Sequence, residues 1–268
     1  MHRFIVAGAA LAVGLVASTS LAMHDGDVNP ALVPAPSNTW KIRTNVWGEG
    51  GALVTDQSVF LGTFGDSGFP TFTSDPGFDA SPGTFVPGTR VGFHAPQGLL
   101  RWTGTGLEPV VDQRLKVSFL TLEALIGAEP NEGFDLAVQS NGGWHRHFSF
   151  DITSEAGTPP GADVFVCPMT LYSTDRTVLE SDIFWIVLNY QSDPLVAEEA
   201  ADWIDAALAE PNCAEDLDFD HQVAASDLAA LLGAWGTAPE SGFADLDGDG
   251  EIGAGDLALM LGSWGTCG

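Results

Sequence analysis

Two acidic segments near the C-terminus carry the residues best suited to hold a metal ion. They are DLDFDHQVAASD, residues 216–227, and DLDGDGEIGAGD, residues 245–256, which lie 29 positions apart. Calcium takes about six to eight oxygen ligands in loops of this length. The spacing therefore predicts two calcium sites. The ligands at loop positions one, three, five, seven and twelve are Asp216, Asp218, Asp220, Gln222 and Asp227 in the first loop, and Asp245, Asp247, Asp249, Glu251 and Asp256 in the second, with Gln222 and Glu251 contributing backbone carbonyls.

The two loops differ where a calcium loop turns most sharply. Position six is Gly250 in the second loop, and glycine adopts positive φ without steric cost. The first loop has His221 there, and histidine reaches this region less readily. We therefore expect weaker binding in the first loop. Position eight is apolar in both, Val223 and Ile252, which predicts that the loops pair back to back over a small core.

Each loop is followed by the same short apolar pattern, DLAALLGAWGT and DLALMLGSWGT. The spacing of the apolar residues predicts one amphipathic helix after each loop. A calcium loop followed by a helix, present twice, resembles a dockerin, and in particular is similar to Cys-bracketed, planctomycete-type dockerin-like modules. The resemblance implies an EF-hand-like module that binds calcium and a cohesin-like or other surface receptor. The late-loop pairs Ala225-Ser226 and Ala254-Gly255, however, replace the hydroxyl pairs that dockerins usually present to cohesins.

Two of the three cysteines lie around the acidic repeats, and the third lies before them in the sequence. Cys213 and Cys267 lie on either side of the two repeats, and exported proteins occupy compartments where disulfides persist. We therefore predict a disulfide between Cys213 and Cys267. Cys167 stands in an alternating apolar segment and is predicted to be a buried free thiol.

The N-terminus predicts export. Residues 1–22 contain a basic Arg3, an apolar stretch and small residues before the expected cleavage after Ala22, which is the pattern of a secretory signal peptide. No later stretch is long enough to span a membrane, so we expect a secreted, extracellular or cell-surface protein that does not span the membrane after cleavage. The net charge of −27 argues against nucleic acid as a partner, because phosphates need Lys and Arg.

The middle of the chain consists of short alternating segments separated by Gly, Pro and Asp. This pattern predicts a mainly β domain over residues 40–193, an antiparallel β-sandwich or jelly roll. Residues 23–39 are predicted to form a flexible arm, residues 65–88 a long loop, residues 194–211 a connecting helix, and residues 212–268 the calcium-binding module. The expected strands are 40–47, 51–56, 58–64, 89–94, 99–104, 115–122, 134–140, 144–153, 163–173 and 182–190.

The segment WHRHFSFDIT, residues 144–153, carries the most suggestive chemistry of the β domain. On one strand, His145 and His147 would share a face about 7 Å apart, given the rise per residue. They could bind Zn²⁺ or Cu²⁺ with a third ligand from His94, His24 or Asp151. A solvated polar strand face is the alternative. Trp144, Phe148, Phe150 and Ile152 would face the core, so Arg146 must lie at its rim or pair with another group.

A second resemblance concerns the β domain. The segments SDPGFDASPGTFVPGTRVGF, WHRHFSF and SDIFWIVLNYQSD resemble a set of exported β proteins, some with a PEP-CTERM sorting tail and some linked to zinc-responsive repression. The resemblance implies metal handling by the β domain and a placement role for the exchangeable tail.

The sequence holds no motif of a catalytic triad, a zinc protease or a phosphate loop. We therefore expect an exported, non-catalytic β-sandwich protein, with a metal-handling β domain, held at the cell surface or in an extracellular assembly by its calcium-binding tail. The alternative is a secreted polysaccharide-active enzyme or carbohydrate-binding module, active in polysaccharide catabolism and carried by a dockerin. Its acid pair could come from carboxylates such as Glu108 and Asp112.

Overall fold

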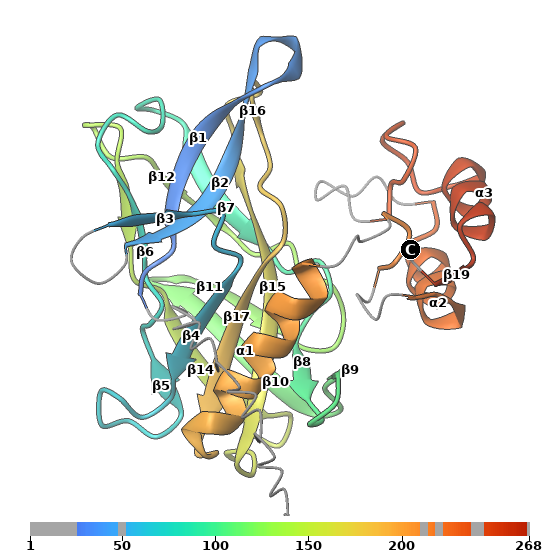
Figure 1. Cartoon of the computed structure of the whole chain (residues 1–268). Helices are drawn as coiled ribbons and strands as arrows, with labels where there is room; N and C mark the ends of the chain where they lie inside the picture. Colours follow the sequence, from blue (N-terminus) through green and yellow to red (C-terminus); the bar gives the residue numbers. More distant parts are fainter. Residues whose placement is uncertain (1–25, 48–51, 210–213, 218–221, 237–243, 267–268) are drawn as a thin grey trace, which may run out of the picture.

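The computed structural model describes residues 26–47, 52–209, 214–217, 222–236 and 244–266. Within these ranges the chain is mainly β, with several sheets and three α-helices (Figure 1). No helix in the described part of the chain combines the length and the apolar character needed to cross a membrane. The expected signal peptide, residues 1–22, lies outside the described residues.

The largest sheet, here called the large sheet, has seven strands in the order β12-β7-β15-β17-β4, with β8 beside β15 and β9 beside β8. The pair β15–β17 is antiparallel, whereas β17 and β4 are parallel. The strands are β4 (Val59–Thr63), β7 (Arg90–His94), β8 (Leu100–Trp102), β9 (Leu107–Pro109), β12 (Asp135–Ala137), β15 (Asp163–Ser173) and β17 (Phe184–Tyr190).

The central strands β15 and β17 are buried on both faces, which explains their continuous apolar sequences. Side chains alternate across a strand, so Phe165 and Cys167 enter the main core, while Val164 and Val166 enter a second core on the other side. Pro168 stands where the neighbour of β15 changes from β8 to β7, a position that tolerates a residue without an N–H.

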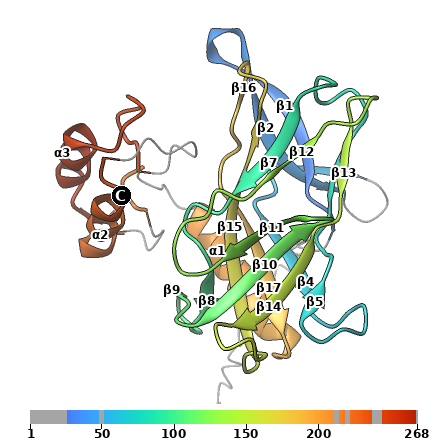
Figure 2. The same ribbon diagram turned by 180° about the vertical axis from the view of Figure 1, so that it is seen from behind.

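A smaller sheet, β11-β10-β14-β5, faces the large sheet across the main core (Figure 2). Leu115 and Val117 of β10 and Phe150 and Ile152 of β14 are buried there. This arrangement agrees with a sandwich at the level of two facing sheets. The strands are β5 (Phe72–Thr73), β10 (Gln113–Phe119), β11 (Leu122–Ile126) and β14 (Ser149–Ser154).

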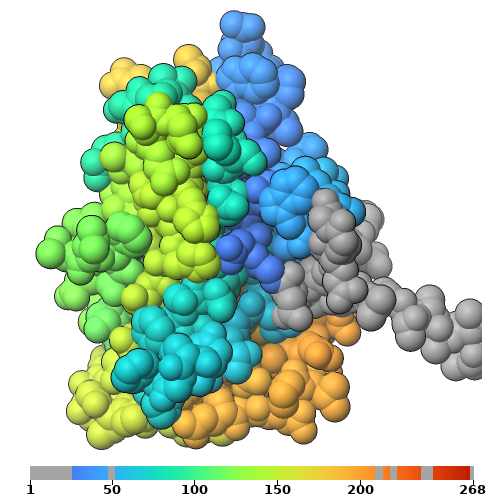
Figure 3. All heavy atoms as spheres, turned by 90° about the vertical axis from the view of Figure 1, so that its left-hand side faces the viewer, coloured from blue at the N-terminus to red at the C-terminus, as the bar shows by residue number. Residues whose placement is uncertain are grey.

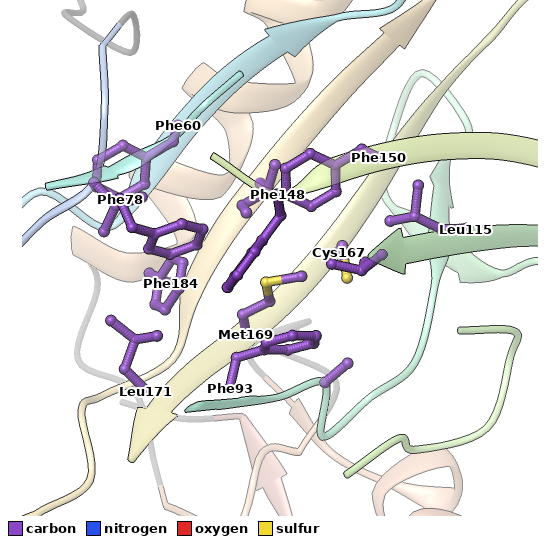
Figure 4. Packing of buried hydrophobic residues seen from close by; sticks show 14 of the residues in the cluster. Phe60, Phe78, Phe93, Leu115, Phe148, Phe150, Cys167, Met169, Leu171 and Phe184 are labelled. Atoms are coloured by element: carbon purple, nitrogen blue, oxygen red, sulfur yellow. The ribbon is translucent and has the colours of Figure 1, made fainter. Parts of the chain in front are cut away.

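Aromatic rings fill the main core. Phe148 lies at their centre, with ring centroids 5.0 Å from Phe78, 5.5 Å from Phe93 and 5.4 Å from Phe134. Figure 4 shows Phe148 between Phe78 and Phe150. Cys167 is buried and free, as predicted, and its burial raises the pKa of the thiol.

The expected flexible arm, residues 23–39, is wrong for its described part. Residues 29–35 form strand β1 (Asn29–Ala35), followed by the 3-10 turn η1 (Pro36–Asn38). Strand β1 pairs with β2 (Thr39–Trp47), which also pairs with β3 (Leu53–Thr55) and, in parallel, with β16 (Val178–Leu179). The two prolines of β1 concealed the strand from the sequence pattern, and they are tolerated because β1 is an edge strand.

Other expected elements also differ. The predicted loop 65–88 contains β5 and β6 (Phe78–Ala80). The single strand expected over 115–122 is a hairpin, because Leu120 adopts positive φ between β10 and β11. The strand expected over 144–153 is broken into β13 (Trp144–Arg146), which pairs with β6, and β14. The sheets are mostly antiparallel but include the parallel pairs β16–β2 and β17–β4, which corrects the purely antiparallel prediction.

Helix α1 (Pro194–Ala209) confirms the predicted connecting helix. It begins at a proline, whose missing N–H costs nothing in the first helical turn. The small residues Ala197, Ala200 and Ala201 are buried with Ile204 against the outer face of the large sheet. The helix therefore forms a third layer over β4 and β17 (Figure 1).

The C-terminal part contains two short helices, α2 (Ala225–Gly233) and α3 (Ala254–Gly262). Two short strands, β18 (Gln222–Val223) and β19 (Gly265–Thr266), pair with each other. The two helices follow the two acidic loops, as the repeated apolar pattern predicted. Their buried residues form a core separate from those of the β domain.

Candidate metal centres

The second acidic loop gathers three carboxylates. One oxygen each from Asp245, Asp247 and Asp249 lies within 4.8 Å of the others. The loop wraps around Asp245: its Oδ1 accepts the N–H of Gly248 at 2.8 Å, and its Oδ2 accepts the N–H of Gly250 at 2.9 Å. Gly250 has the positive φ that position six was predicted to need.

Asp256, at position twelve, lies outside this group of three. It stands in the first turn of α3, where its Oδ2 accepts the N–H of Gly253 at 2.6 Å and its Oδ1 accepts the N–H of Leu246 at 2.6 Å. Burial alone would raise the pKa of Asp256, but the N–H groups of Gly253, Asp247 and Leu246 lower it below the ordinary carboxyl value. The side chain thus ties the loop to the helix that follows.

The described part of the first loop repeats this arrangement. Asp227 Oδ2 accepts the N–H of Ala224, and Asp227 Oδ1 accepts the N–H of Leu217, both at 2.7 Å. These partners, Ala224 and Leu217, are the counterparts of Gly253 and Leu246 in the second loop, and Asp216 is buried. The predicted ligands Asp218 and Asp220, with His221, lie outside the described residues, as do Cys213 and Cys267 of the predicted disulfide.

The two repeats share one core, and backbone hydrogen bonds join each repeat to the other. Val223 and Ile252 are fully buried in the same cluster. Val223 pairs with Gly265 between β18 and β19, and the N–H of Gly236 donates to the carbonyl of Ile252 at 2.8 Å. The described backbone pairing therefore joins each loop to the Trp-Gly-Thr segment of the other repeat, rather than loop to loop.

The apolar residues of α2 and α3 divide between the core and the surface. Leu231 and Met260 are buried, whereas Trp235 and Trp264 are 43% and 50% exposed. Leu232 and Leu261 are exposed as well. The repeat therefore places a leucine and a tryptophan at equivalent surface positions in each half.

The two histidines of the β domain have different partners. His145, in β13, has its Nδ1 at 3.1 Å from Asp79 Oδ1. His147, at the break between β13 and β14, has its Nε2 at 3.6 Å from Asp27 Oδ2 and its Nδ1 at 3.7 Å from Asp75 Oδ1. The rings lie 5.2 Å apart between centroids. Because the strand breaks after Arg146, the two histidines do not share one strand face as predicted. His145 lies beside Asp79, and His147 lies beside Asp27 and Asp75.

The expected third ligands are engaged elsewhere or lie outside the described residues. His94 is buried, stacked on Tyr172, with its Nδ1 at 2.9 Å from Glu180 Oε1. Asp151 accepts a hydrogen bond from Thr71 at 3.1 Å and lies near Lys116. His24 is not among the described residues.

Arg146 lies at the rim of the core, as predicted. Its guanidinium stands 5.6 Å from the ring centroid of Phe119. It donates to the carbonyls of His145 at 2.6 Å and Ala137 at 2.7 Å. Its partial burial lowers the pKa of the guanidinium.

Asp27 and Asp75 were missed by the sequence reasoning. They fall in the segments predicted as a flexible arm and a long loop, and nothing in their spacing connects them with His147. The two segments are brought together by backbone contacts of Val28 with Gly77 and Phe78.

No protein-family model matches this chain, and none of the curated proteins is significantly similar to it.

Proposed function

We propose that the protein is exported and held at the cell surface or in an extracellular assembly by its C-terminal calcium-binding module, which displays a non-catalytic β-sandwich domain. The observation that carries the proposal is the repetition of the tail: two acidic loops, each bound through its twelfth residue to the helix that follows. The equivalent donors lie at equivalent positions in both halves. Such duplication is typical of paired calcium loops.

Electrostatics supports calcium as the ion. No Lys or Arg occurs in the sequence after Arg176, so the tail offers no positive side chain to balance Asp245, Asp247 and Asp249. Carboxylates at this separation repel one another, and a hard divalent cation relieves that repulsion. Calcium therefore stabilises the folded tail in this proposal.

The exposed residues of the tail support a docking role. Leu232, Trp235, Leu261 and Trp264 are exposed at equivalent positions of the two repeats. Tryptophan is enriched at the centres of protein interfaces because it buries a large area with few rotatable bonds. The proposed receptor is a cohesin-like or other surface protein. The proposal includes the disulfide Cys213–Cys267, which would join the two ends of the tail module.

The test uses the full chain and envelopes of the cells that produce it. We expect the protein to sediment with the envelopes in calcium and to remain in solution in excess chelator. The double variant Trp235→Ala with Trp264→Ala should keep its calcium sites and lose sedimentation. Equal sedimentation of the wild-type protein with and without calcium would refute tethering through the loops.

A second candidate function, a carbohydrate-binding module, is favoured by one surface feature. A groove of about 530 Å³ is lined by the exposed ring of Trp40 together with Thr84, Ser173, Asp175 and Thr177. An aromatic ring among hydroxyl groups suits stacking on a sugar. Trp40→Ala should weaken binding to insoluble polysaccharide in this case, while Trp47→Ala, which changes an exposed tryptophan of the same strand outside the groove, should not.

A further inference from the structure

We propose that Asp27, Asp75 and His147 form a binding site for one divalent transition-metal ion, with Zn²⁺ as the representative ion. The three residues come from three segments: the approach to β1, the loop between β5 and β6, and the break between β13 and β14. One ligand atom from each lies within 4.8 Å of the others. The proposal does not depend on the calcium sites of the tail.

The tautomer of His147 leaves one nitrogen available as a ligand. Its Nδ1 lies 3.2 Å from the carbonyl oxygen of Ser74. A carbonyl can only accept a hydrogen bond, so Nδ1 carries the proton and Nε2 of the neutral ring carries the lone pair. A backbone acceptor on the far nitrogen is the usual support of a metal-binding histidine.

Asp27 is oriented toward that nitrogen. Its Oδ1 accepts the N–H of Gly77 at 2.7 Å, and this bond directs Oδ2 at His147 Nε2, 3.6 Å away. Gly77 also provides the space for the ring, because a Cβ at this position would overlap the imidazole of His147. Both the histidine and the carboxylate are therefore held by the same short backbone segment.

The spacing of these atoms fits a shared ion better than a hydrogen bond. An N–H···O bond spans about 2.7–3.2 Å, and the 3.6 Å between His147 Nε2 and Asp27 Oδ2 exceeds it. Two ligands of one tetrahedral zinc ion lie about 3.4 Å apart, given bonds near 2.1 Å. The nitrogen and the oxygen are thus close to the separation that an ion would impose.

The surroundings favour a cation. Desolvation and the negative charges of Asp66 and Asp27 raise the pKa of Asp75. Among the described residues, the ion pairs of Asp27 and Asp75 are with His147, not with Lys or Arg. An imidazole beside two carboxylates suits a transition ion rather than Mg²⁺ or Ca²⁺, which prefer oxygen ligands alone.

The site is open to solvent. Asp27, Asp66 and Asp75 line one groove of about 390 Å³ together with Gly62 and Thr63. In Figure 3 the dark-blue start of β1 meets the cyan β5–β6 segment and the yellow-green β13 segment at the surface. Water or a small exogenous ligand can complete the coordination from the groove. A bound ion would fasten the approach to β1 to the two segments beside it.

The experiment titrates Zn²⁺ into the full chain by calorimetry, with Ca²⁺ kept at saturation so that the tail loops are occupied. The wild-type protein should bind Zn²⁺ at this site, and His147→Gln or Asp27→Asn should lower the affinity at least about tenfold, since even the loss of an outer-shell partner costs about that much. Asn at position 27 keeps an acceptor for Gly77 and therefore the local fold. The matched control is His145→Gln, which removes the neighbouring histidine.

Three results would overturn the proposal: unchanged Zn²⁺ binding in His147→Gln, equal loss in His145→Gln, or loss of the zinc site in the tail variant Asp245→Ala. Co²⁺ absorption in place of Zn²⁺ gives a second measurement, and its d–d bands should change in His147→Gln and not in His145→Gln. Circular dichroism of each variant in chelator separates loss of binding from loss of folding.

Discussion

The N–H of Gly236 donates a hydrogen bond to the carbonyl of Ile252 at 2.8 Å, so the end of the first repeat lies against the loop of the second. The reciprocal contact is the pairing of Val223 with Gly265. Both glycines have positive φ, 75° and 127°. This relationship gives the repeated Trp-Gly-Thr sequence a structural role, because glycine allows each repeat to turn back onto its partner.

Gly236→Ala should destabilise the tail module by about 1–2 kcal/mol, the cost of placing an L-residue in the left-handed region. A Cβ at this position meets no atom within 4 Å, so the change in stability reports the backbone strain alone and no steric clash. Gly233→Ala is the matched control, because a Cβ there is equally free of contacts but φ is not positive. Hydrogen exchange of peptides from residues 222–266 should quicken in the first variant only; equal exchange in both would contradict the role assigned to Gly236.

Asp245→Ala should reduce the number of bound calcium ions from two to one. Asp245 holds the loop through three backbone N–H groups besides offering an oxygen to the ion, so both the ligand and the loop shape are lost. Glu251→Ala is the control, since position seven is expected to contribute only its backbone carbonyl. Calorimetry that finds two sites in Asp245→Ala, or one in Glu251→Ala, would be inconsistent with the predicted ligand set.

Alkylation should distinguish the three cysteines. Cys167 is buried, and burial raises the pKa of its thiol, so it should not react in the native protein. After unfolding without reductant, only Cys167 should be modified, because Cys213 and Cys267 are predicted to be bonded. Closing a loop of this length contributes at most about 4 kcal/mol in the entropy model. A label on Cys213 or Cys267 before reduction would exclude the disulfide.

The same thiol predicts a dependence of stability on pH. The folded chain keeps the Cys167 proton at a higher pH than the unfolded chain does, so the unfolded chain releases it first. Stability should therefore fall as pH rises above about 8.5, by up to about 1.4 kcal/mol per pH unit. Urea denaturation at several pH values would measure the slope. Cys167→Ala should have a shallower slope in this range, and an unchanged slope would show that other groups cause it.

Phe148→Ala should cost about 3–5 kcal/mol, the usual range for removing a buried aromatic ring. The ring is fully buried and lies among Phe78, Phe93, Phe134 and Trp144. Phe69→Ala is the control, because Phe69 is 69% exposed, and its effect should stay within about 0.5 kcal/mol. Chemical denaturation monitored by far-UV circular dichroism compares the two.

The sequence predicts the elements whose side chains alternate or repeat, and it fails where pairing depends on distant segments. The length of β15 and the position of α1 follow from local pattern. Strand β1 does not follow from local pattern. Its prolines indicate a loop, and the strand forms only through its pairing with β2. The hairpin after Phe119 was missed because its turn uses Leu120 in place of glycine or asparagine.

The two candidate sites differ in the same respect: one is built from residues close in sequence and the other from residues far apart. The carboxylates of the second tail loop are close in sequence, so spacing alone predicts that Asp245, Asp247 and Asp249 meet. It does not predict that Asp256 lies outside this group, where it accepts backbone N–H groups. The sequence pattern indicates His147 through its alternation with His145, and this alternation is lost in the structure because the strand breaks between β13 and β14. Its partners Asp27 and Asp75 are distant in sequence, and their approach depends on the contacts of Val28 with Gly77 and Phe78.

Under the proposed tethering through the tail, the position of α1 has a mechanical consequence. A pulling force on residues 210–268 enters the described β domain at the C-terminal end of α1, and this helix is joined through residues 191–193 to β17, which lies between β15 and β4 in the large sheet. The force would peel the alanine-rich face of α1 from the sheet before it loads the backbone hydrogen bonds of β17. The helix can thus yield under tension while the two facing sheets stay folded.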